Sequence, residues 1–493
     1  MSIIPIAFIT VFSYYVPIDY ERRCCSLKQN RIVYPSQPIS GVIRKAISLL
    51  SDVIVDETVV YPACICWDSY APDPNFRDFI IGTRKSNPLV AQRSPAQLTK
   101  AEEYAICVEA DTVIIEGFDD AGVLYGCADF YPKYVAQKTL TYDSSTYFRH
   151  IFTEDLEDAF IQSAPAAKNR GLWTWGHVIY DYRGYIDNMV KLKMNTLIIW
   201  NDHPPFNARE LVSYAHDSGV KIIWGFSWLW ELDCSKTDLT RRMDAPREIA
   251  AYYEENYGSL GGDGIYFQSF TEVLTETIGD VLVAEAVAQF VNETSALIFE
   301  KHPQMELQFG LHSESVRNQL DFIRQVDPRI RIVWENCGCF PYSYMPDVVT
   351  SFPETMEFVD RISRLRGAEE RFGVVLKGLT KLKWSSFQNQ AGPFVLGSSS
   401  AKMQENRIAR KRKIWHFVQA GWLINGDKAQ EAIALMCRNT GGDLYVTALV
   451  EDGMFEKRMY YPVALLGEFM WDCTSDPKAI MHRVALRNDV DFV

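Results

Sequence analysis

The sequence predicts an α/β protein in which a (β/α)8 TIM barrel follows a small α/β sandwich domain. Two observations lead to this prediction. From Arg170 onward, strand-like and helix-like segments alternate strictly, and each strand candidate is almost continuously apolar. Parallel strands that are buried on both faces have this composition. Eight such units within about 280 residues are typical of a closed barrel.

The first unit, residues 1–145, mixes strands with two helices and predicts the sandwich domain. Its expected strands are 31–35, 76–83 and 104–117, the last with a turn at Asp111, and its expected helices are 41–54 and 119–130. We expect the apolar residues 1–16 to form a first strand, because they lack the basic region and cleavage pattern of an export signal. No group of acids, histidines and nucleophiles occurs here, so we expect a scaffold role.

The second unit, residues 146–493, is expected to be the barrel with a C-terminal helical tail. Its eight strands are expected at 171–176, 195–202, 221–228, 264–272, 305–312, 331–338, 372–380 and 443–451. Helices are expected between and after them at 182–193, 207–218, 245–257, 281–300, 315–326, 353–365, 406–423 and 458–471.

Composition and charge limit the classes of partner. A net charge of −13 argues against nucleic acid or an anionic membrane as the main partner, because both require basic patches. The 11 cysteines include no C-x-x-C pair, so neither a zinc ribbon nor a thioredoxin-type site is indicated. We expect a cytoplasmic protein without cofactor, with a periplasmic or secreted location as the alternative. Homo-oligomerisation is left open.

Polar residues end several of the expected strands, and in a barrel of this type the active site lies at these carboxyl ends. The polar candidates are Asn201, Asp202, His203, Glu272, His312, Glu335, Asn336 and Glu451. Aromatic candidates at the same ends are Trp173, Trp175, Trp200, Trp228, Trp334, Tyr342 and Trp384. Carboxylates among aromatic rings indicate a sugar-binding cleft, in which the rings stack on a pyranose and the acids bind its hydroxyl groups.

Glu272 and Glu335 are the expected catalytic pair. Their strands are two apart, which places their backbones roughly 10 Å apart, and glutamate side chains can then reach the roughly 5–9 Å found between glycosidase carboxyls. Glu272 follows a dry strand and is the expected acid with a raised pKa, whereas Glu335 is the expected nucleophile or base. The alternatives are that Glu272 caps a helix and that Glu335 pairs with a barrel arginine. Three further alternatives remain open: His312 is a structural histidine, Asp202-His203 only shapes a turn, and Glu451 lies in a turn.

Two further stretches resemble a known group of enzymes. Asp119, Gly122, Tyr125 and Gly126 form a D-x-x-G-x-x-Y-G pattern, and an arginine, Arg170, and a K-M-N turn, 193–195, precede the first two barrel strands. This resembles the N-terminal domain and barrel of β-N-acetylhexosaminidases, α-glucuronidases and α-N-acetylglucosaminidases. The resemblance implies a glycoside hydrolase whose acid ends the fourth strand, at Glu272. Thr271 stands where hexosaminidases have an aspartate that steers an acetamido group. An α-glucuronidase would use cations, and the candidates are Arg170, Lys377, Lys381 and Lys383.

We therefore expect an exo-acting glycosidase that removes a terminal uronic acid or N-acetylhexosamine from an oligo- or polysaccharide with two carboxylates. One alternative is a barrel that binds carbohydrate without cleaving it. Another is a metal-dependent hydrolase on the same fold. The sequence has no H-E-x-x-H motif and no H-x-H on the first barrel strand, so no metal site is predicted.

Overall fold

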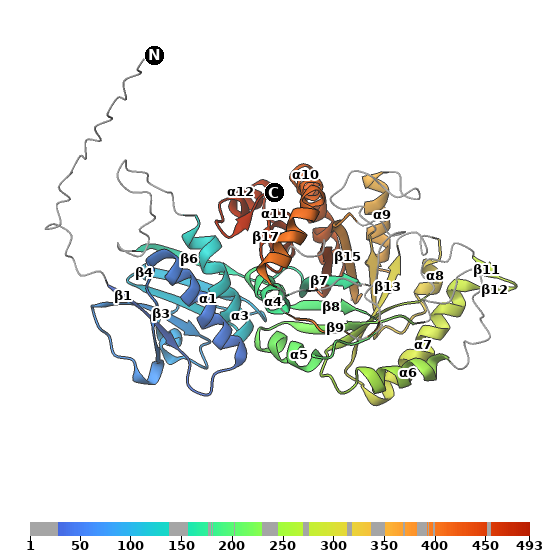
Figure 1. Ribbon diagram of the computed structural model, residues 1–493, viewed down its shortest axis with the longest axis horizontal. Helices are drawn as coiled ribbons and strands as arrows, with labels where there is room; N and C mark the ends of the chain where they lie inside the picture. Colours follow the sequence, from blue (N-terminus) through green and yellow to red (C-terminus); the bar gives the residue numbers. More distant parts are fainter. Residues whose placement is uncertain are drawn as a thin grey trace, which may run out of the picture.

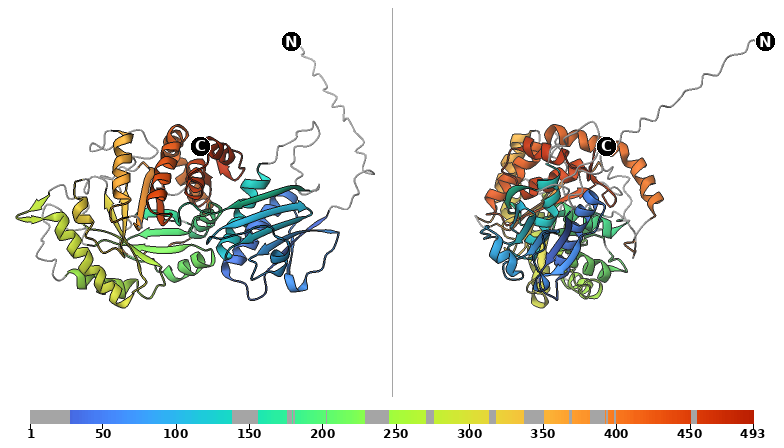
Figure 2. Two further views of the ribbon diagram at one scale, coloured as in Figure 1. Left: turned by 180° about the vertical axis from the view of Figure 1, so that it is seen from behind. Right: turned by 90° about the vertical axis from the view of Figure 1, so that its left-hand side faces the viewer.

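The protein consists of an N-terminal unit and a barrel that lie side by side along the long axis (Figures 1 and 2). The computed structural model describes residues 28–137, 156–175, 179, 181–201, 203–228, 245–269, 276–312, 318–336, 351–367, 370–381, 392, 394–397, 400–450 and 455–493. The strand expected within residues 1–16 lies outside this part of the chain. Among the described residues, none of the helices combines the length and the apolar character needed to cross a bilayer.

The N-terminal unit is built on a six-stranded mixed sheet. Its strands are β1 (Gln29–Tyr34), β2 (Ala63–Cys66), β3 (Phe76–Gly82), β4 (Tyr104–Ala110), β5 (Thr112–Gly117) and β6 (Leu156–Ser163), in the order β2-β1-β3-β5-β4-β6. Its helices are α1 (Gly41–Thr58), α2 (Pro88–Arg93) and α3 (Asp120–Phe130), with short turns η1 (Trp67–Ser69) and η2 (Tyr131–Val135). The expected strands and helices are confirmed. The strand β6 pairs with β4, so this sheet continues beyond residue 145.

The second unit is a closed barrel of eight parallel strands. They are β7 (Asn169–Trp175), β8 (Thr196–Trp200), β9 (Lys221–Gly225), β10 (Gly264–Gln268), β13 (Glu306–His312), β14 (Arg331–Glu335), β15 (Phe372–Leu379) and β16 (Leu444–Val450). The order around the barrel is β10-β13-β14-β15-β16-β7-β8-β9. All eight expected strands are present, and the predicted fold class is confirmed.

Helices surround the barrel. They are α4 (Tyr182–Lys191), α5 (Ala208–Asp217), α6 (Ala245–Asn256), α7 (Val283–Lys301), α8 (Leu320–Ile323), α9 (Phe352–Ile362), α10 (Ala401–Asn439), α11 (Tyr461–Trp471) and α12 (Pro477–Ala485). Two short pairs, β11 (Thr277–Ile278) with β12 (Val281–Leu282) and β17 (Met459–Tyr460) with β18 (Val490–Asp491), complete the fold. The helix α10 is longer than expected, whereas α8 is shorter.

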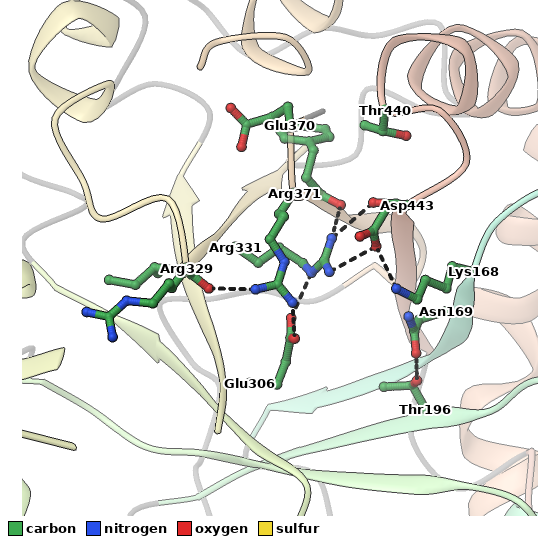
Figure 3. A network of polar contacts seen from close by, with 12 residues as sticks. Lys168, Asn169, Thr196, Glu306, Arg329, Arg331, Glu370, Arg371, Thr440 and Asp443 are labelled. Carbon is green, nitrogen blue, oxygen red and sulfur yellow. Dashed lines mark hydrogen bonds and ion pairs between the residues drawn. The ribbon is translucent and has the colours of Figure 1, made fainter. Parts of the chain in front are cut away.

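An ionic network around a buried arginine lies at the amino-terminal end of the barrel (Figure 3). The fully buried Arg331 lies 2.8 Å from Glu306 Oε1 and 3.1 Å from Asp443 Oδ1, and its guanidinium stacks 3.5 Å from the ring centre of Tyr445. Arg371 reaches the other oxygen of Glu306 at 3.0 Å. These charges satisfy one another at the amino-terminal end, whereas active sites of barrels of this type lie at the opposite, carboxyl-terminal end.

A second buried network joins the two units. Lys193, between α4 and β8, lies 2.6 Å from Asp129 of α3 and 2.7 Å from Glu468 of α11, and all three side chains are almost fully buried. Arg170, at the start of β7, lies 2.7 Å from Glu102 of the N-terminal unit. A buried charge is tolerated only when it is paired, so these contacts fix the N-terminal unit against the base of the barrel.

Candidate active site

Glu335 is the last residue of β14 and lies at the carboxyl end of the barrel with only 1% of its surface exposed. Its Oε1 accepts a hydrogen bond of 2.6 Å from the Tyr266 hydroxyl and a second from Gln268 Nε2. Its Oε2 lies 2.5 Å from Lys377 Nζ. Both carboxylate oxygens are therefore oriented by side chains from β10 and β15, which lie on either side of β14 around the barrel.

These contacts set the protonation state of Glu335. Burial alone would raise the pKa of its carboxyl group, but the charge and hydrogen bond of Lys377, the Tyr266 hydroxyl and the charge of His312 together hold this pKa below its usual range. The sequence alternative, a structural ion pair with an arginine, is replaced by a pair with a lysine. The result is an ionised carboxylate in a dry site.

Strand geometry explains why these groups meet. Side chains alternate between the two faces of a strand, so Tyr266 and Gln268 both project into the barrel. Gly310 of β13 lies between them and Glu335: a Cβ atom there would be 2.2 Å from the Tyr266 hydroxyl and 3.0 Å from Glu335 Oε1. The glycine leaves the space through which the hydroxyl reaches the carboxylate.

Two of the predicted tryptophans form the wall near this carboxylate. Trp173 and Trp200 belong to the apolar cluster inside the barrel, and each ring centre lies 5.7 Å from that of Tyr266. Lys377 Nζ lies 5.5 Å from the ring centre of Trp173, within the range of a cation–π contact. The structure thus brings Trp173, Trp200 and Lys377 together around Glu335.

Four predicted polar residues also lie at this end. His312 ends β13, is half-buried and is directly opposite Glu335 in the strand register. Asn336 is fully buried, and its Oδ1 accepts a 3.0 Å bond from the Lys377 backbone. Asn201 accepts a 3.0 Å bond from the backbone of His203, which shapes the turn after β8. His312 is therefore next to the Glu335 carboxylate, whereas Asn201 and Asn336 accept hydrogen bonds from backbone N–H groups.

Three predicted residues lie elsewhere. Trp334 faces the helix layer, with its ring centre 5.5 Å from that of Phe358 in α9, because alternation directs it away from the barrel interior. Trp228 stacks on Phe267 at 3.5 Å in the same outer core. Arg170 lies at the opposite end of the barrel, where it binds Glu102 and backbone carbonyls. The structure does not bring these three to the Glu335 site.

The remaining predictions fall outside the described residues: Glu272, Asp202, Tyr342, Trp384, Glu451 and the side chain of Trp175. Among the residues that are described, no group of three or more histidine, cysteine, aspartate or glutamate side chains could hold a metal ion.

Sequence reasoning assigned no role in the site to Tyr266 and Gln268. The signal was present in the strand Gly264–Gln268, where alternation places a hydroxyl and an amide on the inward face of an otherwise apolar segment. Polar groups at inward positions need partners. Their partner here is a glutamate that is 67 to 69 residues away in the sequence.

The sequence matches no protein-family model and no curated protein. Its fold is similar to that of a GH138 enzyme targeting pectin rhamnogalacturonan II (TM-score 0.52, 12% identity, 92% of this chain and 52% of that chain). It is also similar to CpGH84B (TM-score 0.53, 11% identity, 93% and 70%). A third is the GH115 4-O-methyl-α-glucuronidase BtGH115A, with specificity for decorated arabinogalactans (TM-score 0.50, 12% identity, 91% and 57%).

These comparisons define the class of fold. The chain has the architecture of glycoside hydrolases in which an α/β domain precedes a closed eight-stranded barrel, as the resemblance in the sequence implied. It spans about half the length of the GH138 enzyme (52%) and 57% of the GH115 enzyme.

Proposed function

We propose that this protein is a glycoside hydrolase, exo-acting, in which Glu335 is the ionised carboxylate of a two-carboxylate mechanism. The observation that carries the proposal is the buried Glu335 with a lowered pKa, at the carboxyl end of a barrel strand. An ionised, oriented carboxylate can attack an anomeric carbon, stabilise an oxocarbenium-like centre or activate a water molecule. It is a poor general acid, because it carries no proton at neutral pH.

A separate general acid is therefore required, and Glu272 is our candidate. It follows Gln268, the end of β10, by a few residues in the sequence. The order β10-β13-β14 keeps the end of that strand two positions from Glu335. This separation, roughly 10 Å between backbones, suits a pair of glutamates in a glycosidase.

For the sugar, we propose a terminal uronic acid or N-acetylhexosamine. One structural neighbour is a 4-O-methyl-α-glucuronidase, which supports the uronic acid. However, the Lys377 ammonium is bound to Glu335, and a uronate carboxylate would need a different cation. Thr271 in place of an aspartate argues against the usual acetamido-assisted mechanism of hexosaminidases, so both sugars belong in the first assay.

The test combines an aryl glycoside panel with two variants. Glu335→Gln should lower kcat/KM on the best substrate more than about 1,000-fold. It should also destabilise the fold by about 3 kcal/mol, because it removes the negative charge that offsets the burial of the Lys377 ammonium. The double variant Glu335→Gln with Lys377→Met removes both charges, and we expect it to recover stability but not activity.

These variants separate catalysis from a structural ion pair. If Glu335 only stabilises the barrel, the double variant will recover turnover together with its free energy of unfolding, and the proposal is then wrong. Glycan binding by the wild type without turnover on any glycoside of the panel would favour the carbohydrate-binding alternative.

A further inference from the structure

The loop after β8 presents an exposed aromatic side chain at the carboxyl end of the barrel. Phe206 is 78% exposed, more than any other phenylalanine in the described part of the chain. Val395, in the connection between β15 and α10, is 60% exposed. Single exposed apolar residues are common on protein surfaces, whereas neighbouring ones at a ligand-binding end of a fold indicate a contact surface.

Hydrogen bonds join the two segments that carry these residues. The Phe206 backbone N–H donates to the Phe394 carbonyl at 2.8 Å. The Asn207 side chain bonds Leu396 in both directions, accepting from its N–H at 3.1 Å and donating to its carbonyl. Leu396 is buried, so the pair rests on a packed base. A surface fixed in this way loses little conformational entropy when a ligand binds.

The position of this pair relates it to Glu335. In the closed strand order, β8 and β14 are four strands apart in both directions and so lie on opposite walls of the barrel. From a strand spacing of about 4.8 Å, the opposite walls are about 12–15 Å apart. That span is larger than one sugar ring held at Glu335.

We propose that Phe206 and Val395 form a binding surface for a second sugar residue of the substrate, adjacent to the one held at Glu335. This inference rests on the proposed function. The C–H face of a pyranose carries partial positive charge and complements the negative face of the phenyl ring. The apolar pair carries no charge that would select a uronate. It therefore increases the affinity for longer oligosaccharides and does not discriminate between terminal sugars.

The test compares short and long substrates. Phe206→Ala should lower kcat/KM on a trisaccharide about five- to tenfold. It should leave kcat/KM on the aryl monoglycoside of the same terminal sugar unchanged, and Phe206→Trp should retain the preference for length. Ile424→Ala is the matched control, because Ile424 is 75% exposed on α10 and lies outside the loops that follow β8 and β15. An equal loss on both substrates, or no loss on either, would overturn the inference.

A binding measurement separates this inference from the proposed function. Isothermal titration of the wild type and Phe206→Ala with chitotriose and with a glucuronate-capped xylotriose needs no turnover. Should the wild type cleave no glycoside but bind a trisaccharide that Phe206→Ala binds more weakly, the surface is supported and the hydrolase proposal fails. Absence of both cleavage and binding by the wild type would overturn both.

Discussion

At the scale of single residues, the site is organised by the pair of Glu335 and Lys377. The two are cross-strand neighbours, because Glu335 is opposite Val375 in the register and Lys377 is the next inward residue of β15. Burying the Glu335 carboxylate alone would be costly, and the positive charge of Lys377 offsets that cost. The same charge keeps Glu335 deprotonated, so one contact serves both the fold and the proposed chemistry.

Replacing Lys377 should therefore shift the acid limb of the pH–rate profile. In the wild type, the lowered pKa of Glu335 keeps the carboxylate ionised at pH values below its usual range. Lys377→Met removes the attraction and leaves the burial, so the pKa of Glu335 rises and activity is lost at a higher pH as acid is added. The measurement is kcat/KM between pH 3 and 8, roughly the range where carboxyl groups and histidine titrate.

Lys381→Met serves as the control for that profile. Lys381 follows the same strand, but its ammonium stacks on Phe417, 3.7 Å from the ring centre. We expect the acid limb of the pH–rate profile of Lys381→Met to match that of the wild type. Coincident profiles for Lys377→Met and the wild type would contradict a role of Lys377 in setting the charge of Glu335.

At the scale of elements, the barrel strands could be predicted because burial on both faces makes them almost continuously apolar. The strand β6 was missed since most of its side chains are at least partly exposed. The first residues of α10 were missed for a similar reason, because they are largely polar and exposed, whereas its C-terminal part, with buried residues from Gly426 to Met436, has the helical spacing that the sequence offered.

The candidate site was predicted less completely than the fold. Glu335 was selected from the sequence because it is a carboxylate that ends an apolar strand, and the structure places it at the carboxyl end of the barrel. Trp228 and Trp334 were assigned to the site because proximity to a strand end does not reveal which face a side chain takes. Alternation places Trp334 and Glu335 on opposite faces of their strand, and the packing of the closed barrel shows which face is inward: Tyr266 belongs to the interior cluster and Trp334 to the outer core.

The close approach of β10, β13 and β14 makes Gly310 a test of this geometry. Gly310→Ala would place a methyl group 2.2 Å from the Tyr266 hydroxyl, so the hydroxyl must leave Glu335 or the strands must separate. We expect a destabilisation of about 1–3 kcal/mol and a loss of activity larger than that of the control. Urea unfolding and the aryl glycoside assay provide the measurements.

Gly397→Ala is the control for that substitution, because no atom of the residues that the structure describes lies within 4 Å of a Cβ placed there and its backbone is not in the left-handed region. It should leave stability and turnover close to those of the wild type. If Gly310→Ala behaves in the same way, the packing of Tyr266 against Glu335 is not essential for the site.

At the scale of the whole molecule, the motifs behind the family resemblance are structural. Asp119 caps α3, a Cβ at Gly122 would lie 2.3 Å from the Glu103 carbonyl, and the guanidinium of Arg170 stacks 5.4 Å from the ring centre of Tyr125. Lys193 of the K-M-N turn joins Asp129 to Glu468. These residues fix one unit against the other, which explains why the resemblance predicts the architecture and leaves the sugar open.

The buried network at this junction should be the main electrostatic support of the two-unit assembly. Lys193→Met leaves Asp129 and Glu468 buried with less compensation, and we expect it to destabilise the protein by about 3–5 kcal/mol at neutral pH. Lys45→Met is the matched control, because Lys45 pairs with Asp187 across the same junction but both side chains are partly exposed. We expect its cost to stay below about 1 kcal/mol, and equal costs would contradict this account.

The pH dependence of the Lys193 effect provides a stricter test of the same network. Burial would raise the pKa of Asp129 and of Glu468, but Lys133 and Lys193 outweigh it and lower both. A carboxylate with a lowered pKa in the folded state contributes stability above its ordinary pKa and loses that stability as the pH falls through the folded value. Without Lys193 the folded pKa values of Asp129 and Glu468 rise, because Lys133 and Arg483 alone compensate the two buried charges less fully, and protonation then relieves the remaining excess of negative charge. The difference in unfolding free energy between the wild type and Lys193→Met should therefore shrink below about pH 4, and a difference that stays constant or grows in acid would show that the loss has another cause.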